Sequence, residues 1–486
     1  MSPPPVPSSF PNRRSLLRGA VGGAAALTLA GAMTTRAAAA TGPSVRQTGT
    51  SVLDATALYF VSYDGLVNNN AFQKNGLLTY KGYQYAVWYS ADRNATVARR
   101  AVGSTTWSTA TVGHTLSTDD SHNVISAGVS PADGRLHLVM DSHSSGYYYV
   151  KSAAGLMDAP STTSWSSARF GSVQTGMDGV ALTSTFTYPQ FLVSPQGRLQ
   201  LSYRTGISGN GQAALAEYNN GAWSNLGVWT ANTGTYTSTH GSSTARNLYL
   251  HGLDYGPDGR LHVFGTWREQ STAVTCGANL TNHDTTYTFS DDYGRTWKNS
   301  AGSTVGTTGS TGLVAVGSAG IVVDSLNPDH ALMNQESQAV DSAGLPHALI
   351  SYVPGRFGQC ITDYVAGRTA YARPFHVWKD SAGAWHKTEV PFAMNSSQRS
   401  QLVLDAYDNA YVCMPFGRIA AASASSGWTD WTMLYDGTST LNAFGEVVVD
   451  HTRIAQDGIL SILYQEKSSG TTTPSPLHVI DFQLPV

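Results

Sequence analysis

Ser290-Asp291-Asp292-Tyr293-Gly294-Arg295-Thr296-Trp297 is the stretch that best indicates the fold. It fits the pattern Ser-x-Asp-x-Gly-x-Thr-Trp, an Asp-box, which is a turn that locks a β-hairpin. The aspartate caps the turn, the glycine takes a backbone conformation closed to other residues, and the tryptophan packs under it. The stretch predicts antiparallel strands joined by tight turns and carries no chemistry of its own.

The same alternation of turn and strand recurs along the chain. A turn centred on Gly, or on Asp/Asn, precedes an alternating apolar strand seven times, at intervals of 50 to 85 residues. The expected strands are Tyr83–Tyr89, Arg135–Met140, Arg198–Tyr203, Arg260–Trp267, Leu345–Tyr352, Ala410–Pro415 and Ile459–Tyr464. A four-stranded propeller blade needs roughly 40 to 50 residues, so each interval holds one blade plus loops. The pattern predicts an all-β protein, a seven-bladed β-propeller, rather than a β-helix or a row of β-sandwiches.

Composition agrees with this fold and excludes several partners. The 486 residues include 49 glycines, with 10% aromatic and 13% charged residues, which suits short strands joined by many turns. The formal net charge is −3 and no basic block follows the N-terminal region, so we expect no nucleic-acid partner. The only long apolar run is near the N-terminus, so we expect no membrane span in the mature protein.

The N-terminal region carries an export pattern. Arg13 and Arg14 precede an apolar segment, 19–33, and the small-residue stretch Ala37–Ala40. This resembles a twin-arginine signal in a bacterium, and a signal for unfolded export is the alternative. We therefore predict a signal peptide over residues 1–40, a single catalytic propeller domain over 41–486, and an extracellular, monomeric protein.

Four residues next to strand-like runs have the chemistry of a site. They are His122, His143, Tyr188 and Arg204, within the motifs Asp120–Asn123, Asp141–His143, Tyr188–Phe191 and Ser202–Arg204. Residues at the ends of inner strands on one face of a propeller converge on its axis, so these side chains can meet. Each has a purely structural alternative, as a hydrogen-bonded turn histidine, a packed tyrosine or an ion-paired arginine.

This set suits β-elimination on a uronic acid. The C5 proton lies beside a carboxylate and is weakly acidic, so the carboxylate must be neutralised to stabilise the enolate-like intermediate. An arginine clamps a carboxylate with two hydrogen bonds, and a histidine can add another donor. A base then takes the C5 proton and an acid protonates the leaving oxygen at C4, for which histidine and tyrosine are the expected pair.

Several motifs together resemble one known family. They are Ser121–Asn123, Asp141–His143, Tyr188–Phe191, Tyr203-Arg204, Gly209–Gly211, Arg246–Tyr249, Trp267–Glu269, Asn282–Asp284 and Asn334–Gln338. These motifs resemble the bacterial-neuraminidase-repeat polysaccharide lyases, which include ulvan lyases and rhamnose–glucuronate lyases acting on arabinogalactan. The similarity runs from about residue 55 to the end of the chain.

The resemblance implies a function and roles for residues. It implies a propeller lyase that breaks the bond from rhamnose to O4 of glucuronic acid in an acidic polysaccharide such as ulvan or gum arabic. Residues matching His122 and Tyr188 act as base and acid, in an order that depends on the sugar epimer. Those matching Arg204 and His143 bind the uronate carboxylate. Tyr249, Asn123 and Arg246, in the matching motifs, are predicted substrate contacts.

The cysteines raise the question of a metal. Three cysteines in an exported protein allow at most one disulfide and one free thiol. Cys276, Cys360 and Cys413, with His283, form a plausible tetrahedral zinc set, and the resemblance implies a structural zinc in some relatives. Free thiols, or one disulfide plus a thiol, are the alternatives. We expect no cofactor in catalysis.

Two other functions fit the same architecture. One is a glycoside hydrolase of the sialidase type, for which no stretch shows the required arginine triad and tyrosine–glutamate pair. The other is a non-catalytic carbohydrate-binding propeller that stacks exposed Trp and Tyr residues on sugar rings.

Overall fold

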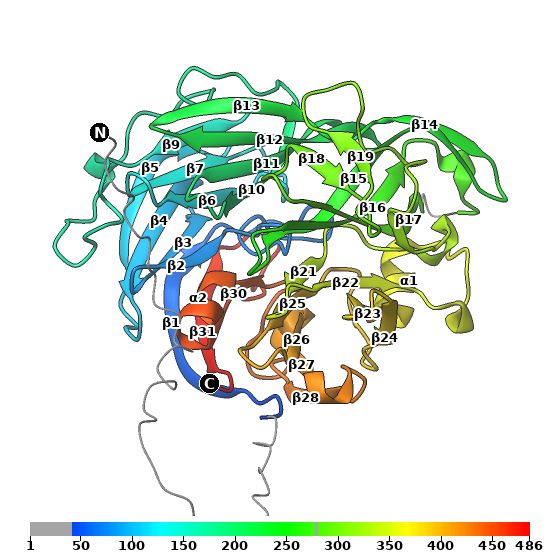
Figure 1. The fold of residues 1–486 in the computed structure, drawn as a ribbon. Helices are drawn as coiled ribbons and strands as arrows, with labels where there is room; N and C mark the ends of the chain where they lie inside the picture. The colour runs from blue at the N-terminus through cyan, green and yellow to red at the C-terminus, as the bar shows by residue number, and fades with distance from the viewer. Residues whose placement is uncertain (1–40, 278–279) are drawn as a thin grey trace, which may run out of the picture. The chain divides into compact units, whose positions relative to one another are not determined.

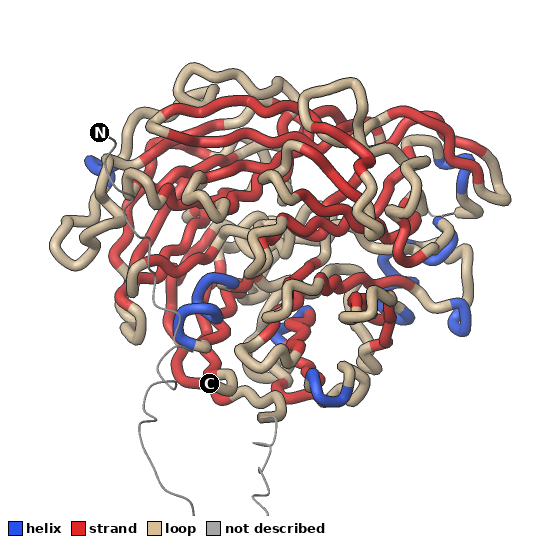
Figure 2. The backbone as a smooth tube through the Cα atoms, viewed as in Figure 1, coloured by secondary structure: helices blue, strands red, loops and turns tan. Residues whose placement is uncertain are grey.

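A computed structural model describes residues 41–277 and 280–486, in which most regular structure is β-strand (Figure 1, Figure 2). The predicted signal peptide, residues 1–40, lies outside the described residues. Residues 41–486 form one compact unit. Among the helices of the described ranges, none has the length and apolar character needed to cross a membrane.

The strands form seven sheets. Six have three to five strands: β2 (Leu77–Tyr80), β3 (Tyr83–Tyr89), β4 (Asn94–Ala101) and β5 (Ser108–Thr115); β6 (Ile125–Ser130), β7 (Arg135–Met140) and β9 (Tyr148–Lys151); β8 (His143–Ser145), β10 (Phe186–Val193), β11 (Leu199–Ile207), β12 (Asn210–Asn219) and β13 (Ala222–Val228); β21 (Ser337–Val340), β22 (Pro346–Tyr352), β23 (Arg373–Lys379) and β24 (Trp385–Glu389); β25 (Gln401–Leu404), β26 (Ala410–Met414), β27 (Arg418–Ala422) and β28 (Thr432–Tyr435); β1 (Arg46–Ala57), β29 (Val448–Val449), β30 (Ile459–Gln465) and β31 (Ser475–Gln483). The other is a larger, curled sheet of β14 (Thr233–Thr237), β15 (Ser242–Tyr255), β16 (Leu261–Glu269), β17 (Asn282–Ser290), β18 (Thr296–Lys298), β19 (Thr304–Thr307) and β20 (Val322–Asp324).

Short helices lie in the connections between strands. The described residues contain two α-helices, α1 (Tyr364–Tyr371) and α2 (His451–Asp457). Their 3-10 turns are η2 (Ser167–Arg169), η3 (Thr272–Val274), η4 (Pro328–His330), η5 (Gly355–Phe357), η6 (Pro415–Gly417) and η7 (Ala424–Ser426).

Each predicted repeat strand falls in a different sheet. The seven are, in chain order, β3, β7, β11, β16, β22, β26 and β30. The prediction of a mainly β protein with a β-propeller is therefore confirmed. Six sheets are regular blades, and the seven-stranded sheet is curled, so the structure does not clearly show seven blades.

The two ends of the described chain share one sheet. β1 pairs antiparallel with β31, from Arg46 opposite Gln483 to Ala57 opposite Ser475 (blue and red in Figure 1). A strand from the start of the chain thus completes the sheet formed by its end. Because unpaired sheet edges invite association with other chains, this closure also protects the edge of β31.

The Asp-box has the predicted structure. The Asp292 carboxylate accepts hydrogen bonds from the backbone N–H groups of Arg295 and Thr296 and from the Thr296 hydroxyl. Gly294 has a φ of 83°, a conformation that favours glycine. Trp297 is fully buried and its ring stacks on Trp229 at a centroid distance of 4.0 Å. The turn fixes the β17–β18 hairpin.

Candidate active site

Strand register brings three of the predicted residues into one row. Thr187 in β10 pairs with His143 in β8 on one side and with Arg204 in β11 on the other. Tyr188, the next residue, lies at a bulge where the register shifts, and has a φ of 59°. Positive φ is uncommon for a tyrosine, and such strained positions cluster at functional sites. The loop between β5 and β6 adds His122 to the same row.

His122 and His143 share a single carboxylate. The rings stack with centroids 3.9 Å apart, and the Nδ1 atoms lie 2.8 and 2.7 Å from the two carboxylate oxygens of Asp120. When Nδ1–H donates to Asp120, each imidazole keeps its Nε2 lone pair available for other partners. Asp120 therefore fixes both rings and leaves one nitrogen of each for a ligand.

The pair is electrostatically tuned. Burial lowers the pKa of His122 to about 4, against the opposing effect of Asp120. Burial alone would raise the pKa of the Asp120 carboxyl, but the hydrogen bonds from His122 and His143 outweigh it and hold that pKa well below its usual value. At neutral pH His122 is a neutral imidazole and Asp120 is a carboxylate.

Asp120 was not among the predicted site residues. Its signal was the repeated Asp-Ser-His, which occurs at Asp120–His122 and again at Asp141–His143. The two aspartates differ in role, because Asp141 hydrogen-bonds the buried His114 and Ser117 instead of a site histidine. Sequence proximity would have paired each histidine with its own aspartate.

Arg204 is a buried cation that has no acidic partner among the described residues. Its side chain is 4% exposed and donates to the hydroxyls of Tyr249, Ser144 and Thr187 at 2.7 to 3.1 Å. Its Nε finds no protein acceptor, and it forms no ion pair within the described ranges. A buried charge is costly unless an opposite charge or strong hydrogen bonds compensate it. The site is therefore built to receive an anion.

Two tyrosines flank the Arg204 guanidinium. Its carbon lies 5.0 Å from the ring centroid of Tyr188 and 5.7 Å from that of Tyr249. Burial raises the pKa of Tyr188 well above its usual value, so this phenol stays protonated. Burial would also raise the pKa of Tyr249, but the positive charges of Arg204 and Arg268 outweigh it, and that pKa is lowered. Tyr249 is therefore the more acidic hydrogen-bond donor.

Predicted site residues line two cavities. A small one of about 30 Å³, here called the site pocket, is lined by Phe72, Tyr188, Arg204 and Tyr249 among others. A larger one of about 350 Å³, the side cavity, begins at His122 and Tyr63 and runs past Arg268 and Arg399. Small size limits the site pocket to one functional group, whereas the side cavity is in the range of ligand sites.

Two predicted substrate contacts lie away from both cavities. Arg246 is fully buried, and its guanidinium lies 2.7 Å from one carboxylate oxygen of Glu269. Asn123 is buried, where its side chain donates to the Thr118 hydroxyl and its carbonyl accepts from Tyr89. The structure does not bring either residue to the site, because the Arg246 guanidinium is paired with Glu269 and the Asn123 side chain is turned to Thr118.

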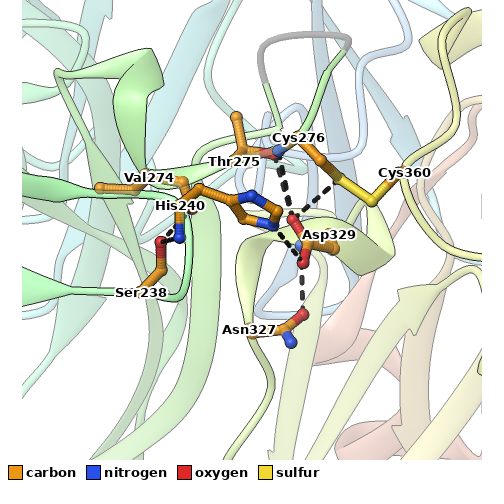
Figure 3. The surroundings of a disulfide bond; sticks show 8 residues. All are labelled: Ser238, His240, Val274, Thr275, Cys276, Asn327, Asp329 and Cys360. Carbon is orange, nitrogen blue, oxygen red and sulfur yellow. Dashed lines mark hydrogen bonds and ion pairs between the residues drawn. A yellow bond between two sulfur atoms is a disulfide. The ribbon is translucent and has the colours of Figure 1, made fainter.

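The predicted zinc ligands do not come together. Cys276 and Cys360 form a disulfide, so their sulfurs are not thiolates available to a metal (Figure 3). His283 is buried and its two ring nitrogens lie 3.0 Å from Glu269 and Asp284. Cys413 is buried in β26, within an apolar cluster. The four-ligand set is corrected to one disulfide plus one free thiol, an alternative that the odd cysteine count had allowed.

The disulfide braces the wall of the side cavity. Cys276 follows η3, and Cys360 lies between η5 and α1. Asp329 lies under the bridge, where it accepts a hydrogen bond from the backbone N–H of Cys276 and lies 3.0 Å from Nε2 of His240 (Figure 3). Close by, Leu280, Ala331, Val353, Ile361 and Tyr364 form a small apolar cluster, three of whose members line the side cavity. The wall is thereby held in place.

Fold and site together define a β-propeller with a buried arginine beside a histidine pair and two tyrosines. A model described as "BNR repeat-containing family member" matches residues 83–393. Because this match covers more than half of the sequence, the chain belongs to the BNR repeat-containing family. The first part of the predicted resemblance is thereby confirmed.

Individual relatives point to ulvan lyases. The chain is 25% identical over 465 residues to "Ulvan lyase, long isoform" of Glaciecola sp. (strain KUL10), covering 84% of this chain and 42% of that protein. It thus spans less than half of that relative's length. The distant similarity to ulvan lyases that the motifs predicted is confirmed.

Solved structures share the fold. The polysaccharide lyase Uly1 is 18% identical, with a TM-score of 0.67 over 90% of this chain and 99% of that one. A PL25 ulvan lyase bound to -[GlcA(1-4)Rha3S]- is 12% identical, with a TM-score of 0.59 over 89% and 95%. At these identities the likeness establishes the fold of the chain.

Proposed function

We propose that the chain is a polysaccharide lyase that cleaves a rhamnosyl-(1→4)-glucuronate linkage by β-elimination. The observation that carries the proposal is Arg204, a buried guanidinium with no acidic partner in the described chain, beside His122 and Tyr188. The distant similarity to an ulvan lyase supports the reaction class. The uronate and rhamnose in the ligand of the PL25 relative support the substrate.

In the proposed reaction the uronate carboxylate enters the site pocket. Arg204 and Tyr249 donate to it and stabilise the negative charge that develops when C5 loses its proton, and His143 adds a hydrogen bond in the form that carries a proton on Nε2 as well as on Nδ1. The C5–H bond breaks toward the base, a C4–C5 double bond forms, and the C4–O4 bond breaks. The leaving oxygen takes a proton from the acid, so the products are an unsaturated uronate and a free hydroxyl.

The environments of His122 and Tyr188 assign their roles in this proposal. His122 is neutral at neutral pH, with Nδ1 held by Asp120, so Nε2 can accept the C5 proton. Tyr188 stays protonated because burial raises its pKa, which suits the acid that protonates O4. We propose His122 as base and Tyr188 as acid, with no cofactor in the reaction.

The proposal also covers the number of blades, the location of the protein and its oligomeric state. We count the curled sheet as the seventh blade, since one repeat strand, β16, lies in it. Action outside the cell rests on the twin-arginine pattern at Arg13 and Arg14. We also propose that the protein acts as a monomer and as one domain over residues 41–486.

The test is to incubate the protein with ulvan and with gum arabic and to follow ultraviolet absorbance and reducing ends together. A lyase yields both signals, because the unsaturated uronate absorbs. New reducing ends without absorbance would mean hydrolysis, as in a sialidase-like enzyme. Binding with neither signal would mean a carbohydrate-binding propeller, and either outcome would overturn the proposal.

Replacement of Asp120 tests how the histidine pair is held. Asp120→Asn keeps the size of the side chain but offers one acceptor in place of two, so the imidazoles lose their fixed tautomer. We expect kcat to fall by about 10²-fold or more, with KM little changed. The matched control is Asp119→Asn, since Asp119 is the neighbouring residue, more than half exposed and paired with Arg93 at the surface. Equal rates for the two variants would contradict the role of Asp120.

A further inference from the structure

The side cavity offers a second guanidinium, which donates no hydrogen bond in the proposed reaction. Two arginines line it, Arg268 and Arg399. Arg399 is engaged, because it hydrogen-bonds the Glu446 carboxylate and the backbone carbonyl of Asn334. Arg268 has neither a hydrogen-bond acceptor nor an ion-pair partner for its side chain among residues 41–277 and 280–486. Its guanidinium is thus available to a ligand in the cavity.

Arg268 lies close to the proposed reaction centre but in a different cavity. It belongs to β16, where it pairs with Asn247 of β15 and Asn282 of β17. Its guanidinium carbon is 5.9 Å from the ring centroid of Tyr249, and that of Arg204 is 5.7 Å from the same ring. Two guanidinium groups therefore flank one tyrosine, one in the site pocket and the other at the side cavity. This spacing suits two anionic groups on neighbouring parts of one ligand.

The remaining lining of the side cavity suits a sugar. Tyr63 at the rim is 71% exposed, with its ring edge against His122 at a centroid distance of 4.6 Å. Exposed aromatic rings stack on sugar faces, so this ring suits a sugar at the rim of the cavity. Asp64 is the acidic residue of this lining. Burial raises the pKa of its carboxyl and so disfavours the ionised form, which would repel an anionic ligand.

We propose that the side cavity is a subsite for the sugar next to the cleaved uronate, and that Arg268 binds an anionic substituent on that sugar. The group is an oxyanion, either a sulfate ester or a second carboxylate, because a guanidinium fork binds both with paired hydrogen bonds. The inference rests on the proposed function for the identity of the neighbouring uronate. Arg268 acts in it as a specificity residue and not in proton transfer.

The experiment compares wild type, Arg268→Gln and Arg268→Lys on ulvan oligosaccharides before and after chemical desulfation. We expect Arg268→Gln to raise KM about ten-fold on the sulfated form with kcat within about two-fold, and Arg268→Lys to recover part of the loss. An effect that vanishes on desulfated substrate identifies the group as sulfate. An effect that persists there identifies it as a carboxylate.

The matched control is Arg260→Gln, because Arg260 immediately precedes β16, is 37% exposed and pairs with Asp291. It should leave KM unchanged. Calorimetric binding of the same oligosaccharides is read in parallel, so the subsite is tested even if no unsaturated product forms. A ten-fold weaker affinity in Arg268→Gln upholds the subsite in that case. Unchanged KM and affinity, a loss confined to kcat, or no binding to wild type overturns it.

Discussion

Arg204→Met will lower kcat/KM for elimination by about 10³-fold, because it removes the paired donors proposed to hold the uronate carboxylate as charge develops at C5. The effect should be mostly in kcat, since that charge is greatest in the transition state. Arg204→Lys keeps the charge without the planar fork, so its kcat/KM should lie between those of wild type and Arg204→Met. Initial rates of ultraviolet absorbance on one uronate-containing polymer measure all three proteins.

The fold of Arg204→Met should survive. Arg204 has no carboxylate partner in the described chain, so its removal strands no buried anion, and an apolar side chain of similar length fills the space. We expect the midpoint of thermal unfolding to be unchanged or raised. Arg198→Met is the matched control, because Arg198 immediately precedes the same strand and pairs with Glu217. If Arg204→Met keeps rates within ten-fold of that control, Arg204 does not bind the reacting carboxylate.

The fold was predictable because its signals are local. A turn residue and the alternating strand that follows it span only about ten residues of sequence. Each predicted repeat strand lies in its own sheet. The Asp-box is equally local, and its capping aspartate, positive-φ glycine and buried tryptophan were all predicted. The curled sheet was not predicted, since extra strands in long intervals leave no distinct periodic signal.

The site was predictable to the extent that strand register alone assembles it. His143, Tyr188 and Arg204 lie at or next to paired positions of three adjacent strands, so a correct blade brings them together. Side-chain partners were not predictable in the same way. Arg246 occurs in a matching motif beside Tyr249, yet its side chain pairs with Glu269 in the interior.

The disulfide pairing and the second histidine contact of Asp120 also depend on residues far apart in the sequence. The disulfide joins residues 84 positions apart, and three cysteines allow three pairings, none of which the spacing favours. Asp120 contacts a histidine two residues away and another 23 residues away. Only the closing of the loop between β5 and β6 over β8 creates the second contact.

Tyr188→Phe will lower kcat by about 10³-fold with little change in KM, because it removes the proton that the leaving O4 oxygen needs while keeping the ring. The ring packs against Phe72 and near Tyr249, and phenylalanine preserves both contacts. The Tyr188 hydroxyl has no protein partner in the described ranges, so stability should be nearly unchanged. Tyr203→Phe, a buried tyrosine of the adjacent strand whose hydroxyl bonds Asn225, should keep wild-type rates.

The pH dependence of the wild type separates the two possible assignments of base and acid. His122 must be neutral to accept the C5 proton, and its pKa in the folded protein is lowered to about 4 by burial. Activity should therefore fall only as the pH drops through about 4, and it should stay level through neutral pH. On the alkaline side, activity should fall only far above neutral pH, because burial raises the pKa of Tyr188 and keeps its phenol protonated. If Tyr188 were the base, only its ionised form would react, and kcat would rise with pH through the alkaline range. A rate that climbs steadily above neutral pH in wild type, and is flat in Tyr188→Phe, would reverse the two roles.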